Sequence, residues 1–176
     1  KSLTVYENLM AAAPNKEGEQ LFASLINTPG RRKREQALTE KADSVLEFLS
    51  LLKVRDVPAL QLSGGQKKLV ELGRVLMLEP RCILLDEPFA ALDEITRDRM
   101  AFELMRIWQQ YRKTVIFVTH SLAEAVFLSD QVVLMSARPG RIHKIYDIDL
   151  PRPRTEDTRL SDDFIRLVGE INRELY

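Results

Sequence analysis

Residues 82–93 read CILLDEPFAALD, the segment most informative about the fold. Four apolar residues run directly into Asp86 and Glu87, a pattern typical of a buried parallel strand that ends in a loop carrying carboxylates. We interpret Cys82, the first residue of this strand, as a small core residue rather than a nucleophile. Because α/β proteins collect their ligands at the carboxyl ends of parallel strands, the two acidic residues mark a candidate site.

The chain after this stretch alternates between helical and strand-like periodicity. A helix is expected over residues 94–111, followed by a β-branched strand over 114–119 that ends at His120. The later predicted elements are a helix over 122–128, a strand over 132–135, an edge-like strand near 142–148 and a terminal amphipathic helix over 162–175. Such alternation predicts an α/β fold with a mainly parallel sheet.

The chain before this stretch is predicted to be helical. Thr4 can cap a first helix that runs through Ala13. Apolar residues at helical spacing predict one long amphipathic helix over residues 31–53, and a third helix is expected over 67–78, where Pro80 ends it. A helical subdomain therefore precedes a partial sheet.

Composition and charge exclude several classes of protein. The 176 residues suffice for one domain, or for one core with an appended subdomain, and 45% hydrophobic residues argue against global disorder. Lys and Arg total 26, as do Asp and Glu, so no net field draws the protein to nucleic acid or to an anionic membrane. The single cysteine excludes an internal disulfide and favours the reducing cytoplasm. No segment reaches the roughly 18 apolar residues of a membrane span.

Three short segments carry groups suited to a phosphate ligand. Two glycines follow Ser63 at the start of a predicted helix, where free amides can bind an anion, although Ser63 alone is explained equally well as a helix cap. Asp86 can hold Mg²⁺ while Glu87 orients and polarises a water, unless the two residues belong to an ordinary polar loop. His120 follows the neighbouring strand, where its imidazole can reach a terminal phosphate or lie unused in a loop.

The order of these segments resembles the nucleotide-binding subunits of ATP-binding-cassette (ABC) transporters. The resemblance rests on four segments in the same order and at similar separations, residues 62–66, 83–88, 91–93 and 118–120. It implies a truncated P-loop NTPase fold of the ABC ATPase type and an ATPase that uses ATP and Mg²⁺.

The resemblance also implies roles for single residues. Asp86 corresponds to the metal-side carboxylate and Glu87 to the catalytic base. Asp93 lies in the loop that crosses a dimer interface, and His120 is the switch histidine that senses the γ-phosphate. The signature motif, which contacts the nucleotide of a second subunit, contains Ser63, Gly64, Gly65 and Gln66.

By the same resemblance, the protein works as a head-to-tail dimer of nucleotide-binding subunits attached to transmembrane permease subunits. A solute-binding protein is an indirect partner, and no nucleic acid is expected. This implies a cytoplasmic protein, peripheral on the inner face of the cell membrane, whose ATP hydrolysis energises solute import. Residues 86–89 and 136–142 resemble subunits of nitrate, sulfonate and taurine importers, whereas residues 3–13 and 66–72 are closer to branched-chain amino-acid importers. These segments do not agree on the identity of the transported solute.

One part of the family pattern is missing from these 176 residues. A phosphate loop needs a glycine followed by lysine, and none of the seven glycines precedes a lysine. Because residues 3–8 resemble a segment that follows the phosphate loop, the adenine-stacking aromatic and the glutamine loop in the family, we expect a truncated sequence and an isolated chain without ATPase activity. The alternative is a non-catalytic remnant or interaction module that supplies only the signature half of a composite ATP site. Genome-maintenance ATPases share these motifs but carry long heptad arms, which this sequence lacks.

The expected organisation has three parts: a helical subdomain over residues 1–78, an α/β core fragment over 79–150 and a helical tail over 151–176. In the resembled fold, the phosphate-loop strand lies between the strand that ends at His120 and the strand over 132–135. We therefore expect residues 82–86 and 115–119 to pair in parallel. The strand over 132–135 is expected to be separate from that pair or to take a new partner.

Overall fold

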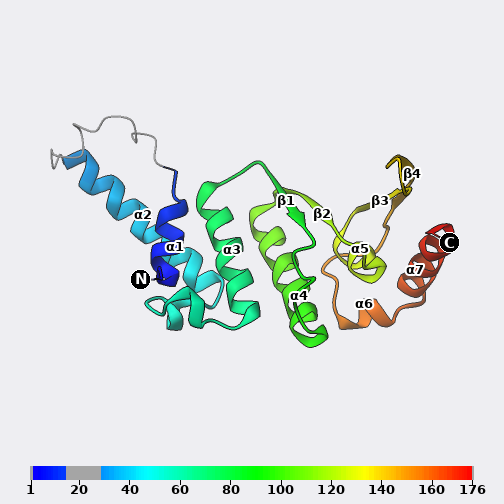
Figure 1. The fold of residues 1–176 in the computed structure, drawn as a ribbon, viewed down its shortest axis with the longest axis horizontal. Coiled ribbons are helices and arrows are strands. Elements are labelled where there is room, and N and C mark those ends of the chain that lie inside the picture. Colours follow the sequence, from blue (N-terminus) through cyan, green and yellow to red (C-terminus); the bar gives the residue numbers. More distant parts are fainter. Residues whose placement is uncertain (1, 15–28, 176) are drawn as a thin grey trace. The chain divides into compact units, whose positions relative to one another are not determined.

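A computed structural model describes residues 2–14 and 29–175 (Figure 1). The chain divides into two compact units, Lys1–Arg81 and Cys82–Tyr176. The described residues of the first unit are helices and turns, and the strands of the described residues lie in the second unit.

The described residues of the first unit form helices α1 (Val5–Ala12), α2 (Pro29–Phe48) and α3 (Gly64–Leu78), with short 3-10 turns η2 (Leu52–Val54) and η3 (Ala59–Gln61). Thr4 caps α1 as predicted, because its hydroxyl accepts a hydrogen bond from the Glu7 amide and the Glu7 carboxylate accepts one from the Thr4 amide. α1 packs against α2 and α3 around a buried apolar core that includes Leu9, Leu46 and Met77. This core supports α3, which begins directly after Ser63.

The end of α2 differs from its prediction. The helix ends at Phe48, so the expected helix over residues 31–53 is wrong in its last turn. Ser50 adopts a left-handed φ of 57°, and the amides of residues 50 and 51 donate to the carbonyls of residues 47 and 46. This pair of bonds is the Schellman motif, which terminates helices. The reversal places Leu51 in the core, where it is 1% exposed.

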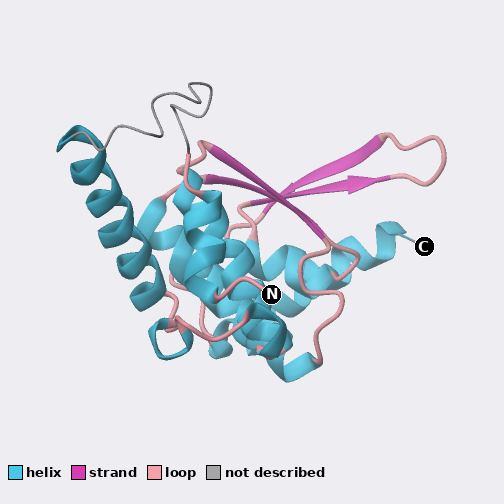
Figure 2. Cartoon of the chain, turned by 60° about the vertical axis from the view of Figure 1, so that its left-hand side comes forward, coloured by secondary structure: helices cyan, strands magenta, loops and turns pink. Residues whose placement is uncertain are grey.

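The second unit alternates strands and helices, as predicted. Its elements are β1 (Cys82–Asp86), α4 (Glu94–Tyr111), β2 (Thr114–Val118), α5 (Leu122–Leu128), β3 (Gln131–Met135), β4 (Ile142–Asp147), α6 (Glu156–Leu160) and α7 (Asp162–Leu175). β1 and β2 pair in parallel, and β3 pairs with β4 in an antiparallel hairpin (Figure 2). The expected parallel pair is confirmed, and β3 is separate from it, with β4 as its partner.

The β1–β2 pair is exposed on one face. Leu84 is 66% exposed and Ile116 is 53% exposed, whereas Ile83, on the opposite face of β1, is buried. The interpretation of β1 as a buried strand is therefore wrong for one face in the described part of the chain. Cys82 is an exposed thiol rather than the core residue that the sequence suggests. Burial that alternates along a strand is the pattern of a sheet covered on one side.

A buried arginine, Arg154, holds the C-terminal segment against α5 within the second unit. Arg154 is 3% exposed, and its guanidinium donates to the backbone carbonyls of Val126, Phe127, Ser129, Ile148 and Leu150. Burial, with a smaller contribution from nearby Arg152, lowers the pKa of Arg154 to about 10, so the side chain stays charged at neutral pH. Its N–H groups bond carbonyls at the end of α5 that have no partner within the helix. α7 also packs against α5.

Candidate functional site

Three predicted site residues lie where β1 and β2 end. Asp86 is the last residue of β1, opposite Val118 at the end of β2, and the Glu87 amide donates to the Val118 carbonyl over 2.9 Å. His120 follows two residues after β2. The parallel pairing therefore brings the loops that carry Glu87 and His120 to the same edge of the sheet. This is the placement that the sequence predicts, and the catalytic roles of these residues stay predictions.

Glu87 and His120 form a direct pair. The His120 Nδ1 atom lies 2.8 Å from Glu87 Oε1 and 2.9 Å from Glu87 Oε2. Because a carboxylate only accepts hydrogen bonds, Nδ1 is the ring atom that carries the proton in this pair. The Glu87 side chain is 37% exposed and the His120 side chain is 76% exposed. A water or a phosphate can therefore reach the pair, while the ring holds the carboxylate in one orientation.

The backbone at Glu87 is strained. Its φ is 43°, a left-handed conformation that costs a non-glycine residue about 1–3 kcal/mol. The other described residues with positive φ, Ser50, Glu79 and Arg112, follow the ends of helices. Glu87 instead turns the chain directly after β1. Strain of this kind clusters at functional sites, which favours a role for Glu87 beyond the fold.

Asp93 begins α4. Its carboxylate accepts a 2.9 Å hydrogen bond from the Thr96 amide, and this bond, together with one from the Thr96 hydroxyl, holds the pKa of Asp93 below its ordinary value. Asp93 is exposed, whereas the adjacent Leu92 is buried and anchors the loop. The structure gives Asp93 a helix-capping role, and its contact across a dimer interface stays a prediction.

Residues 63–66 form the N-terminus of α3 in the first unit. The Ser63 hydroxyl accepts a 3.3 Å hydrogen bond from the Gln66 amide, and the Gln66 side chain accepts a 3.0 Å hydrogen bond from the Ser63 amide. This capping box fulfils the structural role that the sequence allows for Ser63. Gly64 and Gly65 occupy the first turn of a 15-residue helix, where amides have no acceptor within the helix and can bind an anion. Contact with the nucleotide of a second subunit stays a prediction.

Asp86 is the predicted metal ligand, and it is an exposed carboxylate at the end of β1. Across residues 2–14 and 29–175, no group of three or more His, Cys, Asp or Glu side chains could hold a metal ion. Mg²⁺ in phosphate-transfer sites takes one or two protein carboxylates and completes its coordination with phosphates and waters. A single carboxylate at position 86 fits a magnesium ion that is shared with a nucleotide.

A buried polar cluster that the sequence patterns do not predict lies next to these residues. Glu124, on α5, is 8% exposed, and its carboxylate accepts a 2.8 Å hydrogen bond from the Thr119 hydroxyl. The other carboxylate oxygen lies 3.6 Å from the Arg97 Nε atom on α4. The sequence signal is an acidic residue in the first turn of a helix, which the helix dipole explains equally well.

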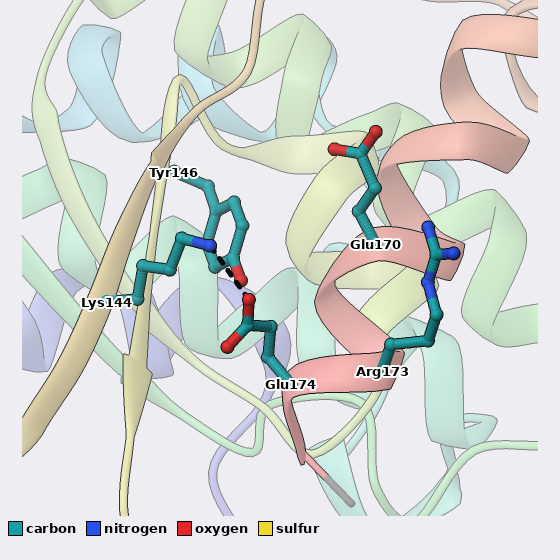
Figure 3. Close-up of a pocket in the computed structure, with 5 residues that line it drawn as sticks. All are labelled: Lys144, Tyr146, Glu170, Arg173 and Glu174. Atoms are coloured by element: carbon teal, nitrogen blue, oxygen red, sulfur yellow. Dashed lines mark hydrogen bonds and ion pairs between the residues drawn. The ribbon is translucent and has the colours of Figure 1, made fainter.

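A polar cleft lies between β4 and α7 (Figure 3). It has a volume of about 260 Å³ and is lined by Lys144, Tyr146, Glu170, Arg173 and Glu174. The Lys144 ammonium donates to Glu174 over 2.9 Å, and this bond, with a smaller contribution from His143, holds the pKa of Glu174 below its ordinary value. Two cations face two carboxylates in this cleft, so it has no net charge to select a ligand. The predicted site residues lie elsewhere.

Comparison with known proteins points to one family. The family model described as ABC transporter matches residues 1–90. An ABC transporter ATP-binding protein of Methanocaldococcus jannaschii is 50% identical over 132 residues, which are 75% of this chain and 48% of that protein. An aliphatic sulfonates import ATP-binding protein of Bacillus cereus is 41% identical over 120 residues, which are 66% of this chain and 47% of that protein. The chain thus spans about half the length of these curated relatives.

A solved structure is also similar. The ATP-binding cassette MJ1267 of an ABC transporter superposes with a TM-score of 0.70 at 28% identity, and the match covers 99% of this chain and 62% of that chain. The predicted ABC ATPase fold is therefore confirmed, in partial form. Within the part of the chain that the structure describes, none of the helices has the length and apolar character needed to cross a membrane.

Proposed function

We propose that this chain, which belongs to the ABC transporter family, forms the signature and catalytic part of an ATP-hydrolysing subunit that energises solute import across the cytoplasmic membrane. One observation carries the proposal: Glu87 and His120 pair directly at the carboxyl ends of two parallel strands, immediately after Asp86. The gene-encoded protein denotes the product of the complete reading frame that contains residues 1–176.

Glu87 is the proposed catalytic base. Its carboxylate takes a proton from the attacking water while the water oxygen bonds to the γ-phosphorus. The bond from that phosphorus to the β–γ bridging oxygen breaks, which leaves ADP and inorganic phosphate. His120 orients the Glu87 carboxylate and would contact the γ-phosphate. Asp86 would hold Mg²⁺, which neutralises charge on the phosphates.

The proposed partners are a second nucleotide-binding subunit and transmembrane permease subunits, with a solute-binding protein acting indirectly through the permease. The protein would then lie on the cytoplasmic face of the membrane. Import is supported by the Bacillus cereus relative, whose name describes an aliphatic sulfonates importer. We extend only the direction of transport to this chain, because the two halves of the sequence resemble importers of different solutes.

Residues 1–176 by themselves are expected to turn over no ATP. A phosphate loop supplies most direct contacts to the β- and γ-phosphates, and no glycine of these residues precedes a lysine. Phosphate release by the purified fragment should equal that of buffer containing Mg²⁺ and ATP. Hydrolysis by the fragment that Glu87→Gln abolishes would contradict this expectation, because these residues would then contain a complete site.

Ser63→Asp in the gene-encoded protein is expected to weaken ATP-dependent dimerisation and to spare ATP binding by the monomer. Aspartate caps a helix as well as serine does, so α3 keeps its N-terminus, but the added negative charge repels the phosphate of the opposing subunit. Light scattering measures the dimer, and equilibrium binding measures the monomer. Thr4→Asp makes the same change at the capping box of α1 and should alter neither quantity. Equal losses in dimerisation and in monomer binding would show that Ser63 serves its own nucleotide.

The missing Gly-Lys pair favours a second candidate function, a non-catalytic module that supplies only the signature half of a composite ATP site. The coding sequence ahead of Lys1 distinguishes the two. A strand followed by a Gly-x-x-x-x-Gly-Lys-Ser/Thr loop supports the catalytic subunit. A start codon directly ahead of Lys1 supports the non-catalytic module.

A further inference from the structure

Glu124 is a buried carboxylate with partners on two separate segments. Its side chain is 10% exposed and lies on α5, outside the loops that carry the predicted catalytic residues. Oε2 accepts the Thr119 hydroxyl, and Oε1 faces the Arg97 guanidinium. Burying a carboxylate costs several kcal/mol unless its partners compensate, so this glutamate is held by Thr119 and Arg97.

The first partner belongs to the loop that presents His120. The Thr119 hydroxyl donates to Glu124 and also accepts the Ser121 amide over 3.0 Å. The Ser121 hydroxyl in turn accepts the Glu124 amide over 3.3 Å. These bonds close a ring over residues 119–124. Because His120 lies inside this ring, the position of its imidazole against Glu87 depends on the Glu124 carboxylate.

The second partner belongs to the segment that carries Asp93. Arg97 lies in α4, and its Nη2 atom donates to the Leu92 carbonyl over 3.1 Å. Its Nε atom is buried without a hydrogen bond, because the Glu124 oxygen that it faces is 3.6 Å away. Charge-assisted N–H···O bonds span about 2.7–2.9 Å, so a shift of less than 1 Å completes this bond. One guanidinium therefore touches both Glu124 and the loop before α4.

We propose that Glu124 is a positioning residue that couples the His120 loop to the Asp93 loop through Arg97. The inference rests on the proposed ATPase function. It adds that the position of the His120 ring against the Glu87 carboxylate and the conformation of the Asp93 loop change together. Position 124 requires a carboxylate, because Thr119 and Arg97 face different oxygens of Glu124, and a glutamine would turn its NH2 group toward one of these two donors and remove the negative charge beside Arg97.

Glu124→Gln in the gene-encoded protein tests the coupling. We expect kcat for ATP hydrolysis to fall about 10–100-fold with KM little changed, because small displacements of a positioned group cost rate rather than binding. Amide NMR signals of both loops, residues 91–93 and 119–121, should shift in the variant. Glu103→Gln is the matched control, since Glu103 also pairs with an arginine, Arg106, but its side chain is 37% exposed on α4. It should leave kcat and both sets of signals unchanged.

Thr119→Val keeps the Glu124–Arg97 pair and removes one donor, so it provides the test if Glu124→Gln does not fold. It should lower kcat in the same direction and shift the signals of residues 91–93, on the far side of Glu124. Parent-like kcat in the folded variants would overturn the coupling, as would signal shifts confined to residues 119–121. Glu87→Gln, measured in parallel, distinguishes a failure of the coupling from a failure of the proposed ATPase function. If it leaves hydrolysis intact, the proposed function fails, and the coupling that rests on it fails as well.

Discussion

Glu87→Gln in the gene-encoded protein is expected to slow ATP hydrolysis by about 10²–10⁴-fold, the range for loss of a positioned general base. ATP affinity should be unchanged, because the glutamine amide keeps the shape of the side chain and can still contact His120. The strained backbone at Glu87 and the direct hydrogen bond between its carboxylate and the His120 ring both favour a role for Glu87 beyond folding.

Single-turnover hydrolysis and equilibrium ATP binding measure the two quantities separately. Glu103→Gln, which replaces a half-buried glutamate on α4, controls for the loss of a carboxylate elsewhere in the same unit. A Glu87→Gln protein that binds ATP and hydrolyses it at the parent rate would place the base at another residue.

Arg154→Ala is expected to lower the free energy of unfolding of the second unit by about 3 kcal/mol or more. The guanidinium donates to five backbone carbonyls from two segments, and alanine leaves the buried ones without partners. The effect should appear in the second unit because every one of these carbonyls belongs to it.

Urea unfolding followed by tryptophan fluorescence measures this loss. Trp108 is the single tryptophan and lies in the second unit, where the Arg152 guanidinium stacks 4.3 Å from its ring centroid. Arg166→Ala is the control, because Arg166 pairs with Asp163 and Glu170 on the surface of α7, and such pairs contribute about 0–1 kcal/mol. Equal effects of the two substitutions would contradict the anchoring role of Arg154.

Local patterns predict the elements that position the candidate site. The bounds of α4 and α5 match the expected ranges. The β-branched run after α4 predicts β2, and β2 pairs in parallel with β1 because consecutive strands joined by a helix usually lie side by side. The contact between Glu87 and His120 follows from that topology, since Glu87 comes one residue and His120 two residues after the ends of parallel neighbours. Periodicity and chain order are sufficient for this part of the structure.

Other features depend on partners that are distant in sequence. The end of α2 was missed because a serine, not a glycine, takes the left-handed position at Ser50. Arg154 follows a proline-rich break, and no local pattern indicates that its guanidinium reaches carbonyls near the end of α5. In the sequence, Glu124 is an acidic residue in the first turn of a helix, which is a common pattern. Its proximity to Arg97, which is 27 residues earlier, comes only from the tertiary structure. Such contacts emerge only from the tertiary fold.

We propose that Ser63 of one subunit and the Glu87–His120 pair of another act on the same nucleotide. The structure of the gene-encoded Glu87→Gln protein with ATP and Mg²⁺ tests this arrangement. We predict a dimer in which the γ-phosphate of each ATP contacts His120 of one copy and the Ser63 loop of the other, with Asp86 beside the metal ion. An ATP that contacts Ser63 and His120 of the same copy, or neither residue, would rule out a site shared between two subunits.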